Sequence, residues 1–411
     1  MVSVNEAGSP SPPSGLARVA TISFLAARAA PSGGFWIALA GGVALARGAQ
    51  HQGARHGFGA SLAAMLETVA IMGPARLGVP LTQAASAPML GRLEARGAGL
   101  LTQILACAAI RVLHNALTAA FFIFVIVGGL DAYAGTYAAL PLISEGSGTA
   151  LVITGVGIVA WTVFATTVQV TVYRRGLREW PDHPAPPADA TEGRDADPAQ
   201  GRFDPRLVSL AAAVGFTVLL LSTAWTVLGS VALLLVVAWF AARSDARVLP
   251  TGAALAAILA LGSLTFGIVG GVGLDEALRR ATRAALLVLV ATWMRAAAGS
   301  SGLREVSRRV LGRLRRLPSV PEAAAALDDL GAGPSLVPAG RSLLRTLGAV
   351  DKRPVPIVDA VLAWVASESA RDTGRDQPVD SGQRTVDGKQ PSALSTVDRP
   401  PSTEPSGAQP A

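Results

Sequence analysis

Residues 207–242 read LVSLAAAVGFTVLLLSTAWTVLGSVALLLVVAWFAA, a run of 36 positions without a charged side chain. A single helix of that length would extend about 54 Å, whereas the hydrocarbon core of a bilayer is about 30 Å thick. The run must therefore fold back on itself as a hairpin. The polar step Ser222-Thr223 divides it into two spans of suitable length, and Trp225 beside that step suits a membrane interface.

The composition of the whole chain agrees with this interpretation. Of its 411 residues, 51% are hydrophobic and only 15% are charged, whereas soluble domains carry about 25% charged residues. Four more uncharged or nearly uncharged runs are long enough to span: 112–130, 148–172, 248–274 and 281–298. We expect an all-α, multi-pass membrane protein with about eight transmembrane helices in two halves, cytoplasmic amphipathic helices and disordered termini.

Three N-terminal segments are harder to assign. Segments 34–46 and 59–72 are short for a crossing, and the second carries Glu67. They are spans, half-helices or re-entrant segments. Segment 16–30 has Arg18 and Arg28 near its ends, which favours an interfacial helix over a further crossing.

Arginine placement predicts the topology. Cytoplasmic loops collect Lys and Arg, and the segment 173–206 holds six arginines whereas the loops 131–147 and 268–274 hold none. This segment is thus expected on the cytoplasmic side of the cell inner (plasma) membrane, and with eight spans both termini are expected to be cytoplasmic. This topology places Arg279, Arg280 and Arg283 near the outer end of the last span, where we expect them on one helical face away from lipid.

Composition breaks divide the chain into six regions. The linker is rich in Pro and acidic residues, and the last region is rich in Ser, Thr, Asp, Gly and Pro, as disordered segments are. The expected regions are a disordered tail (1–15), an N-terminal membrane domain of about four spans (16–176), a flexible linker (177–205), a C-terminal membrane domain of four spans (206–299), cytoplasmic helices (300–366) and a disordered tail (367–411).

An amphipathic basic helix is predicted over 303–317. Its apolar positions recur every three or four residues, with arginines between them, until Pro318. The basic face of this helix has three interpretations: it binds anionic lipid headgroups, it docks into an acidic groove on a partner, or it is simply solvated. Shorter helices are expected over 321–330, 339–347 and 355–365. The candidate partner-docking residues are Arg304, Arg308, Arg309, Arg313 and Arg316.

One polar site is predicted inside the N-terminal half. A charge in hydrocarbon is costly unless it is paired or faces a cavity, and Glu67 lies in an apolar segment while Arg111 and His114 open the next long span. A pair between Glu67 and Arg111 would be either a polar site or a structural ion pair, or the groups would extend to the interface. A secondary carrier using Glu67 is a third functional hypothesis.

The sequence offers no motif for catalysis. It contains no G-x-x-x-x-G-K-[ST] loop, no H-E-x-x-H and no C-x-x-C, and it has one cysteine, Cys107. His51 and His56 are five residues apart, which is reachable for one metal ion but is more typical of a hydrated loop. We therefore expect neither an enzyme nor a cofactor, a metal ion or a nucleic-acid partner.

Residues 201–320 resemble the transmembrane T component of energy-coupling factor transporters, a family of ATP-driven uptake systems. The similarity rests on Phe203-Asp204-Pro205-Arg206 before an apolar hairpin and on Gly273-Leu274-Asp275-Glu276-Ala277-Leu278-Arg279-Arg280 before a span that leads into a basic helix. It covers about 120 of the 411 residues.

That resemblance implies a non-enzymatic scaffold. In the family, cytoplasmic coupling helices dock two ATP-binding subunits and pass their motion to a small substrate-binding membrane subunit, so the basic helix would be the coupling element here. Family members carry Ala-Arg-Gly motifs in those helices. This chain has no such tripeptide after residue 300, and places it at Ala46-Arg47-Gly48 and Ala95-Arg96-Gly97. An alternative role is a membrane-anchored scaffold or regulator.

Overall fold

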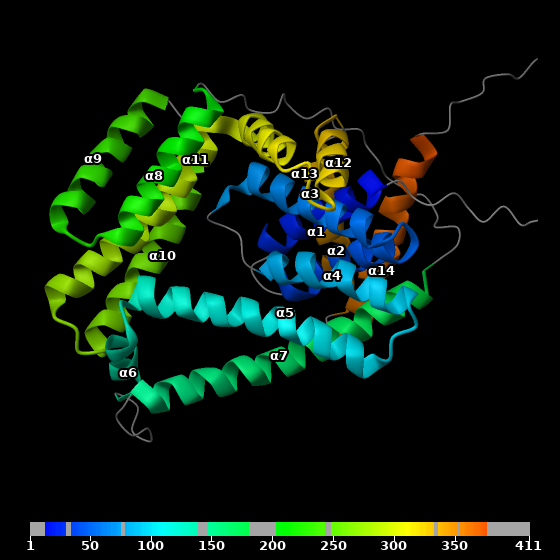
Figure 1. Ribbon diagram of the computed structural model, residues 1–411, viewed down its shortest axis with the longest axis horizontal. Coiled ribbons are helices and arrows are strands. Elements are labelled where there is room, and N and C mark those ends of the chain that lie inside the picture. Colours follow the sequence, from blue (N-terminus) through cyan, green and yellow to red (C-terminus); the bar gives the residue numbers. More distant parts are fainter. Residues whose placement is uncertain are drawn as a thin grey trace, which may run out of the picture. The chain divides into compact units, whose positions relative to one another are not determined.

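The computed structural model describes residues 13–29, 34–74, 79–138, 147–180, 203–242, 248–332, 336–351 and 353–375. All regular secondary structure within these ranges is helical, which confirms the predicted all-α class. The elements (Figure 1) are α1 (Pro13–Ala29), α2 (Gly34–His51), α3 (Ala54–Met72), α4 (Val79–Ala95), α5 (Leu100–Phe121), the π-helical segment η2 (Phe122–Val127), α6 (Leu130–Ala138), α7 (Ser147–Arg178), α8 (Pro205–Leu221), α9 (Trp225–Ala242), α10 (Val248–Val269), α11 (Leu274–Arg313), α12 (Val320–Ala332), α13 (Leu336–Ala349) and α14 (Pro354–Arg375).

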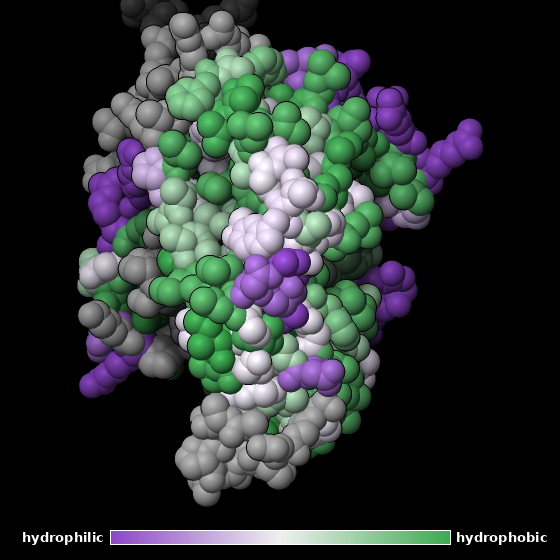
Figure 2. All heavy atoms as spheres, turned by 90° about the vertical axis from the view of Figure 1, so that its left-hand side faces the viewer, coloured by the Kyte–Doolittle hydropathy of each residue, from purple (hydrophilic) through white to green (hydrophobic). Residues whose placement is uncertain are grey.

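Several long helices are apolar enough to cross a membrane. In the part of the chain that the structure describes there are five, and α8 is a shorter apolar helix beside them. The five are Leu100–Val127, Gly148–Arg178, Trp225–Ala242, Val248–Val269 and Leu274–Arg313. Their outward side chains are large and apolar: Leu234 and Phe240 on α9 are 67% and 80% exposed, and hydrophobic residues cover most of the face shown in Figure 2. These helices indicate an integral membrane protein; the described residues hold five candidate spans, where about eight were expected.

The predicted hairpin of residues 207–242 is confirmed. α8 ends at Leu221 and α9 begins at Trp225, so the break falls on Ser222-Thr223 as expected. The start of α8 has a local cause, because the Asp204 side chain accepts a 2.9 Å hydrogen bond from the backbone N–H of Arg206 and Pro205 occupies the first helical turn.

Helices from both ends of the chain share one hydrophobic core. Residues from α1 to α4 pack there with residues from α12 to α14 and with the adjoining ends of α5 and α7. Every residue from Ile37 to Ala46 of α2 is buried, and α2 contacts α1, α3, α4, α7 and α14. Neither α2 nor α3 is among the helices apolar enough to cross a membrane.

The expectation of an interfacial helix at 16–30 is wrong. None of residues 15–28 in α1 is exposed, whereas an interfacial helix needs one face open to headgroups. Small side chains allow this packing: Ala17 and Ala20 are fully buried, and residues of this size let neighbouring backbones approach closely.

The three C-terminal helices occur where the sequence predicts them, but the last one is longer. α14 continues to Arg375, so residues 367–375 are not the disordered segment that their composition suggested. Glu368 is 4% exposed and lies 3.8 Å from the guanidinium of Arg18 on α1, which fixes these turns on the core. The tail up to residue 12, the linker from 181 to 202 and residues after 375 lie outside the described residues.

α11 joins the apolar bundle to this core. It packs against α8, α9 and α10, and it also contacts α3 and α12 (Figure 1). The helix bends at Gly299, whose φ of 70° is a left-handed conformation that favours glycine. This bend separates the predicted span, 281–298, from the predicted basic helix, which ends at Arg313 rather than at Pro318.

Candidate functional site

Glu67 on α3 forms a buried ion pair with Arg304 on the second part of α11. Nε of Arg304 donates to Oε2 of Glu67 at 2.8 Å, and Nη2 of Arg304 donates to Oε1. The Glu67 side chain is 0% exposed and that of Arg304 is 18% exposed. A planar guanidinium matches a carboxylate at two points, so both oxygens are satisfied. This arrangement favours a structural ion pair over a carrier site.

The expected pair between Glu67 and Arg111 is wrong, because Arg111 belongs to a different polar network. Arg111 is 4% exposed, and its Nη2 donates to Oε1 of Gln169 on α7 at 2.7 Å. Nε2 of Gln169 in turn donates to Oγ of Ser86 on α4 at 2.6 Å. The guanidinium also stacks 5.8 Å from the ring centre of Phe35, a contact that stabilises a cation.

The network holds three helices together rather than forming an open site. Arg111 reaches across from α5, Gln169 comes from α7, and Ser86 anchors the chain of bonds on α4 by donating to Thr82 O at 2.5 Å. Nε of Arg111 is buried without a hydrogen-bond partner. His114 is half-buried and forms no hydrogen bond or ion pair with another described residue, so the structure does not bring it together with Glu67.

The predicted docking arginines divide into two groups. Three of them contact carboxylates of this chain. Besides Arg304, Arg308 lies 2.5 Å from Asp328 of α12 and 3.3 Å from Glu305, and Arg309 lies 2.6 Å from Glu305. The contact of Arg308 with Asp328 links the basic segment to α12, whereas Glu305 lies on α11 itself. Together these ion pairs reduce the availability of the three arginines to a partner.

The second group is open. Arg313 and Arg316 are exposed, and neither lies within ion-pair distance of a described carboxylate. Arg315, which was not among the predicted docking residues, is also exposed and lies just after the end of α11 at Arg313. The cluster of Arg313, Arg315 and Arg316 is therefore the part of the predicted docking face that a partner can reach.

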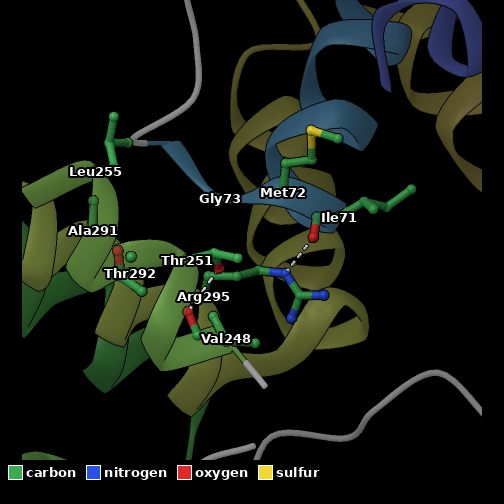
Figure 3. A pocket seen from close by; sticks show the side chains of 10 residues that line it. Ile71, Met72, Gly73, Val248, Thr251, Leu255, Ala291, Thr292 and Arg295 are labelled. Carbon is green, nitrogen blue, oxygen red and sulfur yellow. Dashed lines mark hydrogen bonds between the residues drawn. The ribbon is translucent and has the colours of Figure 1, made fainter. Parts of the chain in front are cut away.

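A cavity of about 180 Å³ lies where α3, α10 and α11 meet (Figure 3). Arg295 of α11 lines it, and its Nε donates to the backbone oxygen of Ile71 at 2.7 Å. Thr251 and Thr292 supply hydroxyls among aliphatic walls. Ligand pockets usually have about 300–1,000 Å³, so this cavity suits small solutes or water. The hydrogen bond between Arg295 and Ile71 beside it joins α3 to the bundle.

Two arginines near the N-terminal end of α11 donate to backbone carbonyls of η2. Arg280 donates to Val127 O and Arg283 donates to Val125 O, and Ser263 of α10 donates to Ile126 O at 2.9 Å. A π-helix end leaves such oxygens without helical partners. Both guanidiniums are thus directed into the protein, toward η2.

Arg279 does not share that face. Its Nη2 lies 2.6 Å from Asp275, and its guanidinium stacks on Trp225 at 6.0 Å. The single arginine face expected for this end of the span is therefore wrong for Arg279, because an exposed i,i+4 carboxylate is closer to it than the π-helical carbonyls are.

The histidines near the end of α2 show no metal cluster. No group of three or more His, Cys, Asp or Glu side chains that could hold a metal ion occurs among the described residues. Nδ1 of His56 lies 2.9 Å from Gln52 O. Desolvation, and secondarily the charge of Arg47, lower the pKa of His51 from its ordinary value.

Comparison with known proteins leaves the functional argument to the geometry. No family model matches the chain, and neither a curated protein nor a solved structure does.

Proposed function

We propose that the chain is a non-enzymatic scaffold of the plasma membrane that couples its apolar bundle to cytoplasmic ATP-binding subunits of an uptake transporter. The observation that carries this proposal is the course of α11. One helix packs within the bundle of α8, α9 and α10, bends at Gly299 and continues to an exposed basic end. Such an element can transmit a displacement between the two regions.

The contacts of the second part of α11 support a coupling role. Arg304 pairs with Glu67 of α3, and Arg308 pairs with Asp328 of α12. These ion pairs attach the segment after the bend to the core that α1 to α4 form with α12 to α14. A force applied at the end of α11 would therefore act on this core and on the bundle together, as the similarity to a T component implies.

Arg315 and Arg316 of the exposed cluster form the proposed docking surface. Its guanidiniums are exposed and lack described carboxylate partners, so they are available to an acidic groove. Arginine suits such a groove because its planar fork binds carboxylates at two points. In the proposed orientation, both termini and this cluster lie on the cytoplasmic side, since the arginine-rich linker precedes α8.

Charge reversal tests the docking surface. Arg315→Glu with Arg316→Glu should abolish co-purification of ATPase activity, and of an ATP-binding subunit identified by mass spectrometry, from native membranes. The matched control is Arg341→Glu with Arg345→Glu, two exposed arginines on α13, which should leave co-purification unchanged. Both variants should elute like the wild-type chain in detergent. ATPase recovery unchanged by the 315/316 pair, or absent from wild-type extracts, would overturn the proposal.

A further inference from the structure

A groove of about 530 Å³ lies between the first turns of α8 and the last turns of α11. Its volume falls within the range of small-molecule sites. Three guanidiniums belong to its lining, and aliphatic side chains from both helices form the rest of its wall. The arginines are Arg206, Arg309 and Arg313, and the aliphatic residues are Leu210, Val306 and Val310.

The groove lies at the boundary between charged and apolar sequence. Arg206 is the second residue of α8, and no charged residue follows it until after Ala242. Leu210 and Val214, one and two turns further along, are 62% and 55% exposed. A ligand seated beside Arg206 would thus continue directly onto a lipid-facing surface.

The charge of the groove is positive on balance. Arg309 contacts Glu305, whereas Arg206 and Arg313 have no ion pair with a described carboxylate, and only the backbone N–H of Arg206 bonds to Asp204. The hydroxyl of Ser209, which also lines the groove, is buried without a hydrogen-bond partner. The groove therefore offers cationic groups and one unused hydroxyl to an anion.

We propose that this groove binds the headgroup of one anionic phospholipid. Its phosphate lies among the guanidiniums of Arg206, Arg309 and Arg313, the Ser209 hydroxyl donates to a phosphate oxygen, and the acyl chains follow Leu210 and the lipid-facing side of α8. A phospholipid fits better than a soluble anion because the same groove combines cationic and aliphatic walls. Basic residues at the membrane surface attract anionic headgroups.

Native mass spectrometry of the full chain in detergent tests this site. The chain is titrated with phosphatidylglycerol and, separately, with phosphatidylcholine of the same acyl chains. One phosphatidylglycerol should bind, and phosphatidylcholine should bind with an affinity at least about tenfold lower. Replacing Arg206, Arg309 and Arg313 by Gln should lower the affinity for phosphatidylglycerol by about a hundredfold, since each arginine near a headgroup contributes roughly a factor of five to the affinity. The matched control replaces three exposed arginines elsewhere by Gln: Arg341, Arg345 and Arg353.

Two results would overturn the proposal. One is equal binding of the two lipids, or phosphatidylglycerol binding that survives the triple replacement. The other is a result showing that the acidic linker, which precedes Arg206 in the sequence, occupies the groove in place of a lipid. If phosphatidylglycerol binds only after the linker carboxylates are neutralised, the linker fills the groove; that variant changes Asp182, Asp189, Glu192, Asp195 and Asp197 to amides. The single Arg313→Gln variant, whose side chain is exposed, should weaken binding without affecting folding.

Discussion

Glu67 and Arg304, separated by 237 positions in the sequence, meet at two points in the interior, where α3 crosses the second part of α11. The pair ties the first third of the chain to the segment that follows the bend at Gly299. Because the carboxylate is fully buried, its charge depends on this one guanidinium for compensation. The attachment of α11 to the core is therefore most sensitive at this contact.

Removing one partner of this pair should destabilise the protein strongly. We expect Arg304→Gln to cost about 3–5 kcal/mol, because it leaves a buried carboxylate without a counter-charge. Glu67→Gln should cost less, since Arg304 is partly exposed and can reach water. The double variant should be more stable than the sum of the two losses predicts. Thermal unfolding of the full chain in detergent measures all three.

The exposed pair of Arg353 and Asp351 supplies the control. Their side chains are 82% and 61% exposed, so Arg353→Gln should change stability by less than about 1 kcal/mol. Equal losses for Arg304→Gln and Arg353→Gln would show that the interior pair does not hold the two segments together.

The features that the sequence predicted well depend on neighbours along the chain. The hairpin of 207–242 follows from an uncharged run too long for one crossing, with a polar step at Ser222-Thr223. The separation of the last span from the basic helix agrees with the bend at Gly299. Local composition determines such boundaries, so periodicity and length were sufficient.

Contacts between distant segments were not predictable in the same way. The sequence paired Glu67 with Arg111 and assigned Arg304 to the docking face, because charge alone does not show which arginine meets a buried glutamate. The burial of α1 and α2 was missed because Ala-rich and Gly-rich helices pack equally well against protein or lipid. α4 was missed because Pro88 lies inside it, and proline normally argues against a helix interior.

The contact between Arg111 and Gln169 can be tested by comparing how much stability each of two substitutions removes. Gln169→Leu should destabilise the protein more than Arg111→Met does. The first leaves a buried guanidinium without its 2.7 Å acceptor, whereas the second leaves only a neutral amide. Thermal unfolding of the two variants in detergent checks the order. The reverse order would mean that Arg111 is compensated by another group.

Arg283 should behave as a cap for η2. It donates to Val125 O, so Arg283→Leu should accelerate hydrogen exchange at Gly128 and Gly129, whose amides bond to Ile123 O at 2.8 Å. Arg279→Leu is the control, because Arg279 pairs with exposed Asp275 instead. If Arg283 faced lipid, the leucine would stabilise the region and exchange would slow.

Gly42 of α2 is required by close packing. A Cβ at this position would overlap the hydroxyl of Tyr173 on α7, which donates to Gln83 at 2.6 Å. Gly42→Ala should therefore lower stability by about 1–3 kcal/mol. Gly155→Ala, at a helical glycine with nothing within 4 Å, should be neutral or stabilise by up to about 1 kcal/mol. Thermal unfolding of both variants measures the difference, and equal effects would contradict the packing of α2 on α7.

The central proposal is that α5, α7 to α10 and the part of α11 before Gly299 lie in lipid, while the core of α1 to α4 and α12 to α14 carries a surface in water. The most direct measurement places one fluorescent probe at Leu234→Cys on α9 or at Arg341→Cys on α13, with buried Cys107 replaced by Ser. In vesicles opened to iodide on both sides, brominated acyl chains should quench the probe at 234 and iodide should not, and the probe at 341 should show the opposite. Iodide quenching at 234, or acyl-chain quenching at both positions, would contradict the account.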